Sequence, residues 1–410
     1  MIIRKGNAHS KESISMLAIM IAIMPILDPY ILAPGLGIGL CDIAILLMAA
    51  YMIIKNQISV FKPLFFLLIF DLVLTLISFT FTQSSHTDLL LALKVAIVFM
   101  LYLLVYSSIW SKGISIDFIK VVEIVGTICA ALALLQFVFA SMGFDFYDGR
   151  LFFPLGEGSY FGGLHDRNTG TLRVHSFFEE PSYLAFYELP VFAHFLQTQK
   201  KWRAALCAGA CLVSGSMIGV LGVVIVLCAF VFFDNAISRK IKFRFAIALL
   251  ITVALIAILY ATWEPIQNIL DYYIYRATSI DQSAQRADSS FSQRILGNYK
   301  LMDRYAPFNK VFGVGFNQYS LYFEIYKDYS NDFVSNLLNF GYIGFFALIY
   351  ALITIAKKSA PMAKMFVLLF LMLLMVDHSW FGPMFFYVLS WIVVLSTQNN
   401  KGLFIRMRLH

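Results

Sequence analysis

Residues 89–109 read LLLALKVAIVFMLYLLVYSSI, and this run decides the fold class. Lys94 is its only charged residue. An α-helix rises about 1.5 Å per residue, so a run of this length crosses the hydrocarbon core of a bilayer, which is about 30 Å thick. The stretch therefore predicts a transmembrane helix, and similar runs recur along the chain.

The composition of the whole chain agrees with this interpretation. Its 410 residues are 60% hydrophobic and only 13% charged, with a mean hydropathy of +0.78. These values exclude a soluble globular protein of this size. We expect an all-α polytopic integral membrane protein with about 12 transmembrane helices. The expected spans are 14–33, 36–54, 63–82, 89–109, 118–140, 182–198, 202–214, 216–233, 243–260, 333–355, 361–378 and 380–396.

The positions of Lys and Arg predict the orientation in the membrane. They gather in the segments expected on the cytoplasmic side, and the outer ones are confined to loops 141–175 and 261–332. The positive-inside rule then places the N- and C-termini in the cytoplasm. Because the basic residues lie between apolar spans and not on one face, nucleic acid is not an expected partner. The five Cys all fall in apolar stretches, so no disulfide framework is expected.

The spans and loops divide the chain into five parts. They are a five-span N-terminal bundle (1–140), an outer loop (141–181), spans six to nine (182–260), a large extracytoplasmic loop between spans nine and ten (261–332), and three final spans with a cytoplasmic tail (333–410). Within the large loop, residues 288–306 carry an apolar stripe at helical spacing and predict a helix. The stretch 202–233 is long for one crossing, and Ser214-Gly215-Ser216 predicts a turn between two short helices.

The charged segment 173–187, RVHSFFEEPSYLAFY, is the best sequence clue to function. It places Arg173, His175, Glu179 and Glu180 just before Pro181 and the sixth expected span. Ionisable groups at a membrane boundary are costly to bury, so a cluster of them indicates a functional site. Proline suits the first turn of a helix, and carboxylates just before it favour the positive end of the helix dipole.

Four stretches in order resemble the O-antigen ligase/polymerase superfamily, and within it the Wzy-type polysaccharide polymerases. They are Arg173 with Phe178-Glu179-Glu180-Pro181-Ser182, then Leu212-Val213-Ser214-Gly215-Ser216, then Arg294 with Gly313-Val314-Gly315-Phe316, then Asn331-Asp332-Phe333 with Gly341-Tyr342-Ile343-Gly344. The resemblance covers roughly residues 120 to 390. Two positions depart from the family pattern. Met217 stands where the family usually has Arg, and Ser330 stands where the ligases have His, which favours a polymerase over a ligase.

The resemblance implies a membrane glycosyltransferase of the bacterial cytoplasmic membrane that joins repeat units at its outer face. The substrate would be an undecaprenyl-diphosphate-linked oligosaccharide, and a chain-length regulator and a flippase would be partners. An acceptor hydroxyl would displace the polyprenyl diphosphate at the anomeric carbon, which requires a base and cations for the leaving group. No cofactor or metal is expected, because the sequence has no Asp-x-Asp motif and no His/carboxylate cluster at ligand spacing.

Six residues are candidates for these roles. Glu180 is the candidate catalytic base and His175 its alternate. The candidate substrate-binding residues are Arg173, Arg294, Ser182 and Asn331, with the two arginines placed to hold a diphosphate. Structural roles compete with these assignments, since Glu180 and Arg173 could form an ion pair that holds the loop. We interpret Glu179 as a solvated or capping carboxylate.

Two other functions compete with a polymerase. One is a ligase that transfers the glycan to a different acceptor. The other is a transporter or flippase of lipid-linked oligosaccharide, which predicts charged residues at mid-membrane and symmetric halves. Here the charges gather at the outer boundary, and no internal repeat is visible.

Overall fold

The structure is a computed structural model that describes residues 8–32, 39–81, 87–112, 115–144, 147–156, 164–165, 172–233, 237–264, 267, 271, 298–325, 330–377, 379–396 and 403–407. Within these residues, a helix occupies every one of the expected spans. The helices are α1 (Ala8–Leu27), α2 (Leu40–Ile54), α3 (Lys62–Phe81), α4 (Leu89–Ser111), α5 (Ser115–Ser141), α6 (Pro181–Gln197), α7 (Lys201–Val213), α8 (Met217–Phe233), α9 (Arg239–Thr262), α14 (Asp332–Lys358), α15 (Lys364–Val376) and α16 (Pro383–Ser396).

Five helices in the described part of the chain are both long and apolar enough to cross a membrane by themselves. They are α3, α4, α5, α9 and α14. Other apolar helices, such as α2 and α16, are shorter. A multi-pass membrane protein is the fold class that these helices support. The count of about 12 crossings, the membrane and the orientation of the termini stay predictions.

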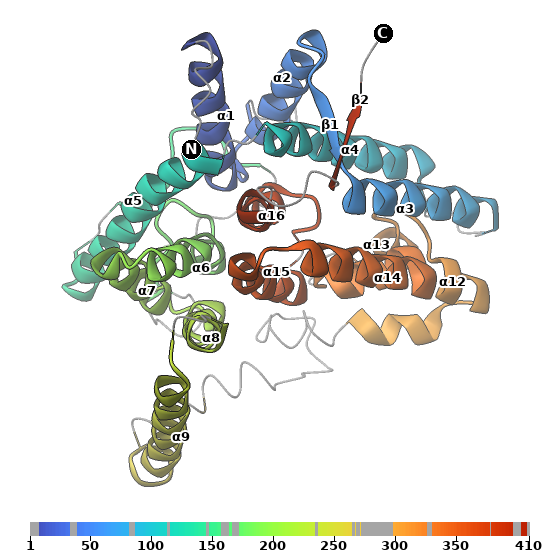
Figure 1. Cartoon of the computed structure of the whole chain (residues 1–410). Helices are drawn as coiled ribbons and strands as arrows, with labels where there is room; N and C mark the ends of the chain where they lie inside the picture. Colours follow the sequence, from blue (N-terminus) through green and yellow to red (C-terminus); the bar gives the residue numbers. More distant parts are fainter. Residues whose placement is uncertain are drawn as a thin grey trace.

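Helix α6 lies inside the bundle, with α7 and α8 on one side and α16 on the other (Figure 1). It packs against α7, α8 and α16, and nearly all its side chains are buried. The rings of Tyr187 on α6 and Tyr387 on α16 stack with their centroids 4.4 Å apart, and the Tyr187 hydroxyl donates to the backbone oxygen of Ala22 on α1. The helix that follows the charged segment is therefore fixed by neighbours from both ends of the chain.

Two helix boundaries define the surroundings of the candidate site. Helix α1 continues past Pro25 but ends at Leu27 and not at residue 33. Pro29 disfavours the helical backbone at Asp28, and the Ile31 N–H then donates to the Pro154 oxygen outside the helix, at 2.9 Å. The turn expected at Ser214-Gly215-Ser216 is confirmed: it separates α7 from α8, and Gly215 has a φ of +63°.

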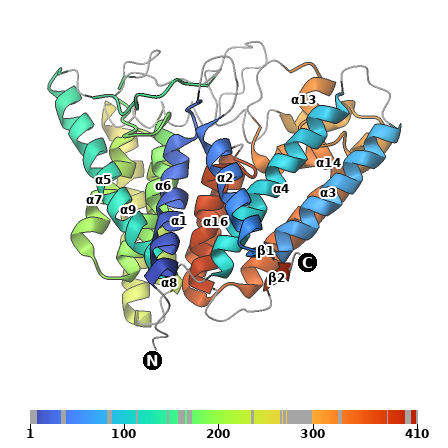
Figure 2. The same cartoon turned by 90° about the horizontal axis from the view of Figure 1, so that it is seen from above.

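The expectation of an all-α chain is wrong in one detail. Strands β1 (Ile58–Phe61) and β2 (Phe404–Met407) pair antiparallel and join the segment before α3 to the C-terminal tail. Figure 2 shows most helices side by side. The Ser108 hydroxyl on α4 accepts a hydrogen bond from the Ser59 backbone N–H at 3.0 Å, which attaches this small sheet to the helices.

The described part of the large loop also differs from the expected helix over 288–306. Residues Asn298–Arg304 form a 3-10 helix, η2, and two short α-helices follow, α12 (Pro307–Phe312) and α13 (Tyr319–Tyr322). Pro307 starts α12, which explains why the earlier helix does not continue. Residues 288–297 lie outside the described residues.

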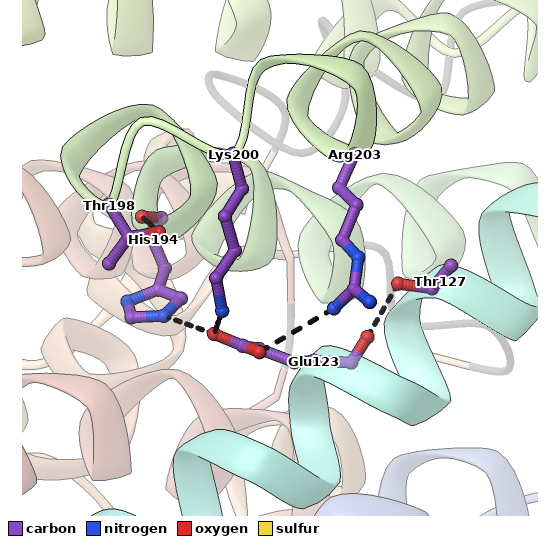
Figure 3. Close-up of polar contacts among 6 residues, drawn as sticks. All are labelled: Glu123, Thr127, His194, Thr198, Lys200 and Arg203. Atoms are coloured by element: carbon purple, nitrogen blue, oxygen red, sulfur yellow. Dashed lines mark hydrogen bonds and ion pairs between the residues drawn. The ribbon is translucent and has the colours of Figure 1, made fainter.

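An ionic network joins α5 to the connection between α6 and α7 (Figure 3). The Glu123 carboxylate lies 2.9 Å from His194 Nε2, 2.5 Å from Lys200 Nζ and 3.6 Å from an Arg203 guanidinium nitrogen. Glu123 itself is buried, whereas Lys200 and Arg203 are partly exposed. One carboxylate therefore offsets the charges of Lys200 and Arg203, and its hydrogen bond with His194 attaches α6 to α5.

We expect Glu123→Gln to lower the free energy of unfolding by about 1–3 kcal/mol, because it leaves cationic groups facing a neutral amide. Exposure of Lys200 and Arg203 keeps the expected loss below that of a fully buried pair. Thermal unfolding in detergent measures the change. Asp117→Asn, at another carboxylate of α5, is the control, and its expected loss is about 0.3–1 kcal/mol, because among the described residues Asp117 interacts only with the dipole at the first turn.

Candidate functional site at the start of α6

The segment that carries Arg173 and His175 is held firmly against the bundle. The Arg173 backbone N–H donates to the Leu164 oxygen at 2.7 Å, and His175 is buried. Gly215 of the α7–α8 turn packs against Arg173, since a Cβ built there would lie 3.2 Å from the Arg173 side chain. The first two of the resembling stretches are therefore in contact.

Residues after His175 are attached to α5. Ser176 has a φ of +55°, its N–H donates to Gln136 Oε1 at 2.8 Å, and its hydroxyl donates to the Cys129 oxygen at 2.8 Å. Both α5 partners are buried. These hydrogen bonds fix the backbone that leads into Glu179 and Glu180.

Helix α6 begins as the sequence predicts. Pro181 occupies the first turn and Glu180 is the N-cap residue. The Ser182 hydroxyl donates to Glu180 Oε2 at 3.0 Å, so two of the predicted site residues interact. Glu180 is exposed at this boundary.

A pocket of about 180 Å³ lies beside this helix start, and we call it the acidic pocket. Its lining residues are Pro25, Asp28, Pro29, Glu179, Tyr183 and Met384. The expectation that Glu179 is a solvated or capping carboxylate is wrong, because Glu180 is the N-cap residue and Glu179 lines the pocket, partly buried. Asp28 was not among the predicted site residues at all.

Burial and like charge make both pocket carboxyl groups less acidic. Burial first, and then the charges of Glu179, Asp42 and Asp377, raise the pKa of Asp28 to about 7. Burial and the charge of Glu180 raise the pKa of Glu179 to about 7. Asp28 is exposed and its surface faces the partly open acidic pocket, so its desolvation is smaller than that of a fully buried carboxyl group, and the like charges around it contribute to the raised pKa. Groups of this kind exchange protons near neutral pH and are suited to acid–base catalysis.

The ends of α14 and α15 lie close to this pocket, since the charge of Asp377 acts on Asp28. The Asp332 backbone N–H donates to the Asp377 oxygen at 3.0 Å, and an Asp332 carboxylate oxygen accepts from the Trp380 N–H at 2.9 Å. Asn331 caps α14, where its side-chain oxygen accepts from the Val334 N–H at 2.9 Å. A helix-capping role is thus visible for Asn331, and its substrate-binding role stays a prediction.

The third and fourth resembling stretches also meet. The backbone N–H groups of Val314 and Gly315 both donate to the Asn339 oxygen, at 2.9 and 2.7 Å. Gly341 has a φ of +64° and kinks α14 where this turn packs. Arg294 lies outside the described residues, and its role in binding the diphosphate stays a prediction.

Within the described ranges, no group of three or more His, Cys, Asp or Glu residues is placed to hold a metal ion. The chain matches no protein-family model, and no curated protein matches it.

Proposed function

We propose that this chain is a membrane glycosyltransferase that polymerises lipid-linked oligosaccharide repeat units into a bacterial surface polysaccharide. The observation that carries the proposal is the acidic pocket, which places Asp28 and Glu179 beside the start of α6. The loop that supplies Glu179 also supplies Arg173 and His175. One short segment thus offers a proton acceptor and a cation, which are the two things that displacement of a diphosphate requires.

The proposed reaction joins the anomeric carbon of the growing glycan to an acceptor hydroxyl. The hydroxyl oxygen forms the new bond to that carbon while the carbon–oxygen bond to the diphosphate breaks, and the hydroxyl proton passes to a carboxylate. Glu179 is well suited to accept it, because a pKa of about 7 leaves a large fraction ionised at neutral pH and still basic. Arg173 is proposed to bind the departing diphosphate. Glu180, which the sequence predicts as the base with His175 as its alternate, remains the alternative to Glu179.

The test is the size distribution of surface glycan in a strain that lacks this chain, with and without the wild-type gene. A polymerase predicts that the long polymer disappears while single repeat units still reach the cell surface. Single units trapped on the inner leaflet would instead indicate a flippase. Undiminished polymer length, with glycan missing from its final acceptor, would indicate a ligase.

A further inference from the structure

A second cavity, of about 600 Å³, lies between α3 and α14, and we call it the α3–α14 groove. Figure 1 shows these two helices beside each other at the edge of the bundle. The residues that line this groove are different from those that line the acidic pocket. The groove is therefore a separate site from the one proposed for catalysis, and its volume is within the range of about 300–1,000 Å³ typical of ligand pockets.

Most of the groove wall is apolar and faces away from the bundle. Phe66 and Phe70 on α3 and Tyr350 on α14 line it, and 61% of the Phe66 surface and 74% of the Tyr350 surface are exposed. Both helices are long and apolar enough to cross a membrane. Large apolar side chains exposed on such helices face lipid, so the groove opens toward the acyl chains of the bilayer.

Among the described residues, the lysines that line the groove lie at one of its ends. Lys62 is the first residue of α3 and Lys358 is the last residue of α14. The two helices run antiparallel, because two successive contacts have opposite order along them. Leu74 of α3 packs against Gly344 of α14, whereas Ser78, one turn later on α3, donates a hydrogen bond to the Phe312 oxygen, in the segment that packs against Gly341, earlier on α14. Lys62 and Lys358 consequently share one mouth, while Val73, about 16 Å along α3, lines the apolar remainder.

We propose that the α3–α14 groove binds an anionic glycerophospholipid. Its phosphate would lie between Lys62 and Lys358 at the membrane boundary, and an acyl chain would follow the groove past Phe66 and Phe70. Basic pockets between transmembrane helices recognise anionic headgroups by this combination of charge at the interface and apolar wall below. A zwitterionic lipid offers the same chains without the net negative charge, so charge is the feature that should select the ligand.

The experiment is native mass spectrometry of the full-length protein in detergent, titrated with phosphatidylglycerol or with phosphatidylcholine of identical acyl chains. We expect phosphatidylglycerol to bind at least tenfold more tightly. Lys62→Gln combined with Lys358→Gln should weaken the binding of phosphatidylglycerol about 30-fold, since two lysines at a membrane surface contribute about 2 kcal/mol to the binding free energy of an anionic lipid. That variant should bind phosphatidylcholine as the wild type does.

Two further variants test whether lipid binding depends on this groove or only on the number of lysines in the protein. Lys55→Gln combined with Lys240→Gln removes two exposed lysines outside the groove and should leave binding unchanged. Ala347→Phe keeps both groove lysines but fills its apolar part, and should displace the lipid. Equal binding of the two lipids, or an equal loss in both double-lysine variants, would overturn the proposal. Melting temperatures measured without added lipid show whether each variant is folded.

Discussion

Glu179→Gln is expected to abolish long-chain polymer while the protein remains folded and inserted. An amide has the shape of the carboxylate but cannot accept the hydroxyl proton, so the loss should be at least 100-fold, the lower end of what a general base contributes. Removal of a partly buried carboxyl group from the acidic pocket should not reduce stability, because burial penalises its charged form. The measurement is the rate of polymer formation in membranes, with melting temperature as the test of folding.

The dependence of the rate on pH separates Glu179 from Glu180. A base must be ionised to act, so the wild-type rate should rise as pH passes through about 7 and then reach a plateau. Glu180→Gln removes a negative charge that raises the pKa of Glu179. If Glu179 is the base, this variant should stay active, and its rise should move to lower pH.

Asp28→Asn tests the second carboxylate of the acidic pocket, and Asp303→Asn is its control outside the pocket. Asp28 lines the acidic pocket, so its loss should reduce the rate; Asp303 is exposed on η2, so its loss should have no effect. The assignment of Glu179 would be contradicted by an active Glu179→Gln enzyme. If Glu179→Gln is active and Glu180→Gln is inactive, Glu180 is the base.

The helices could be predicted from the sequence because the bilayer imposes a length on every apolar run. The run 202–233 illustrates this, since its excess length and its Ser-Gly-Ser turn both indicated a break, and the chain turns there. The end of α1 was predicted wrongly because residues 28–33 continue an apolar pattern. The local signal that does end the helix is a single dipeptide, Asp28-Pro29.

The acidic pocket could not be predicted, because its walls come from distant parts of the chain. Asp28 follows α1, Glu179 precedes α6 and Met384 begins α16. Periodicity indicates which face of one helix is buried, but it does not indicate which helix ends meet. Glu179 was misassigned for the same reason: adjacent carboxylates look equivalent in sequence, and only tertiary packing directs one to the pocket and leaves the other exposed.

Gly313→Ala is expected to destabilise the protein by about 2–6 kcal/mol. Gly313 has a φ of +74°, and a Cβ there would lie 2.1 Å from the Asn339 backbone oxygen. With ψ at −159°, this backbone lies in a region that residues other than glycine essentially do not adopt, which would cost alanine about 1–3 kcal/mol. Overpacking would add about 1–3 kcal/mol. The oxygen it meets belongs to the backbone and accepts hydrogen bonds from Val314 and Gly315, so it cannot move aside cheaply.

Gly143→Ala is the matched control for this prediction. Gly143 also has a positive φ, +77°, but a Cβ there would meet nothing within 4 Å. It should therefore show the backbone strain alone, about 1–2 kcal/mol. Melting temperatures and the fraction of monodisperse protein in detergent measure both variants. A larger loss of stability for Gly313→Ala than for Gly143→Ala would mean that close packing holds this part of the loop against the kink at Gly341. That packing would keep residues 313–316 at a fixed distance from residues 331–341. Equal losses would mean that α14 shifts to admit the methyl group, and that this part of the loop is not rigidly held.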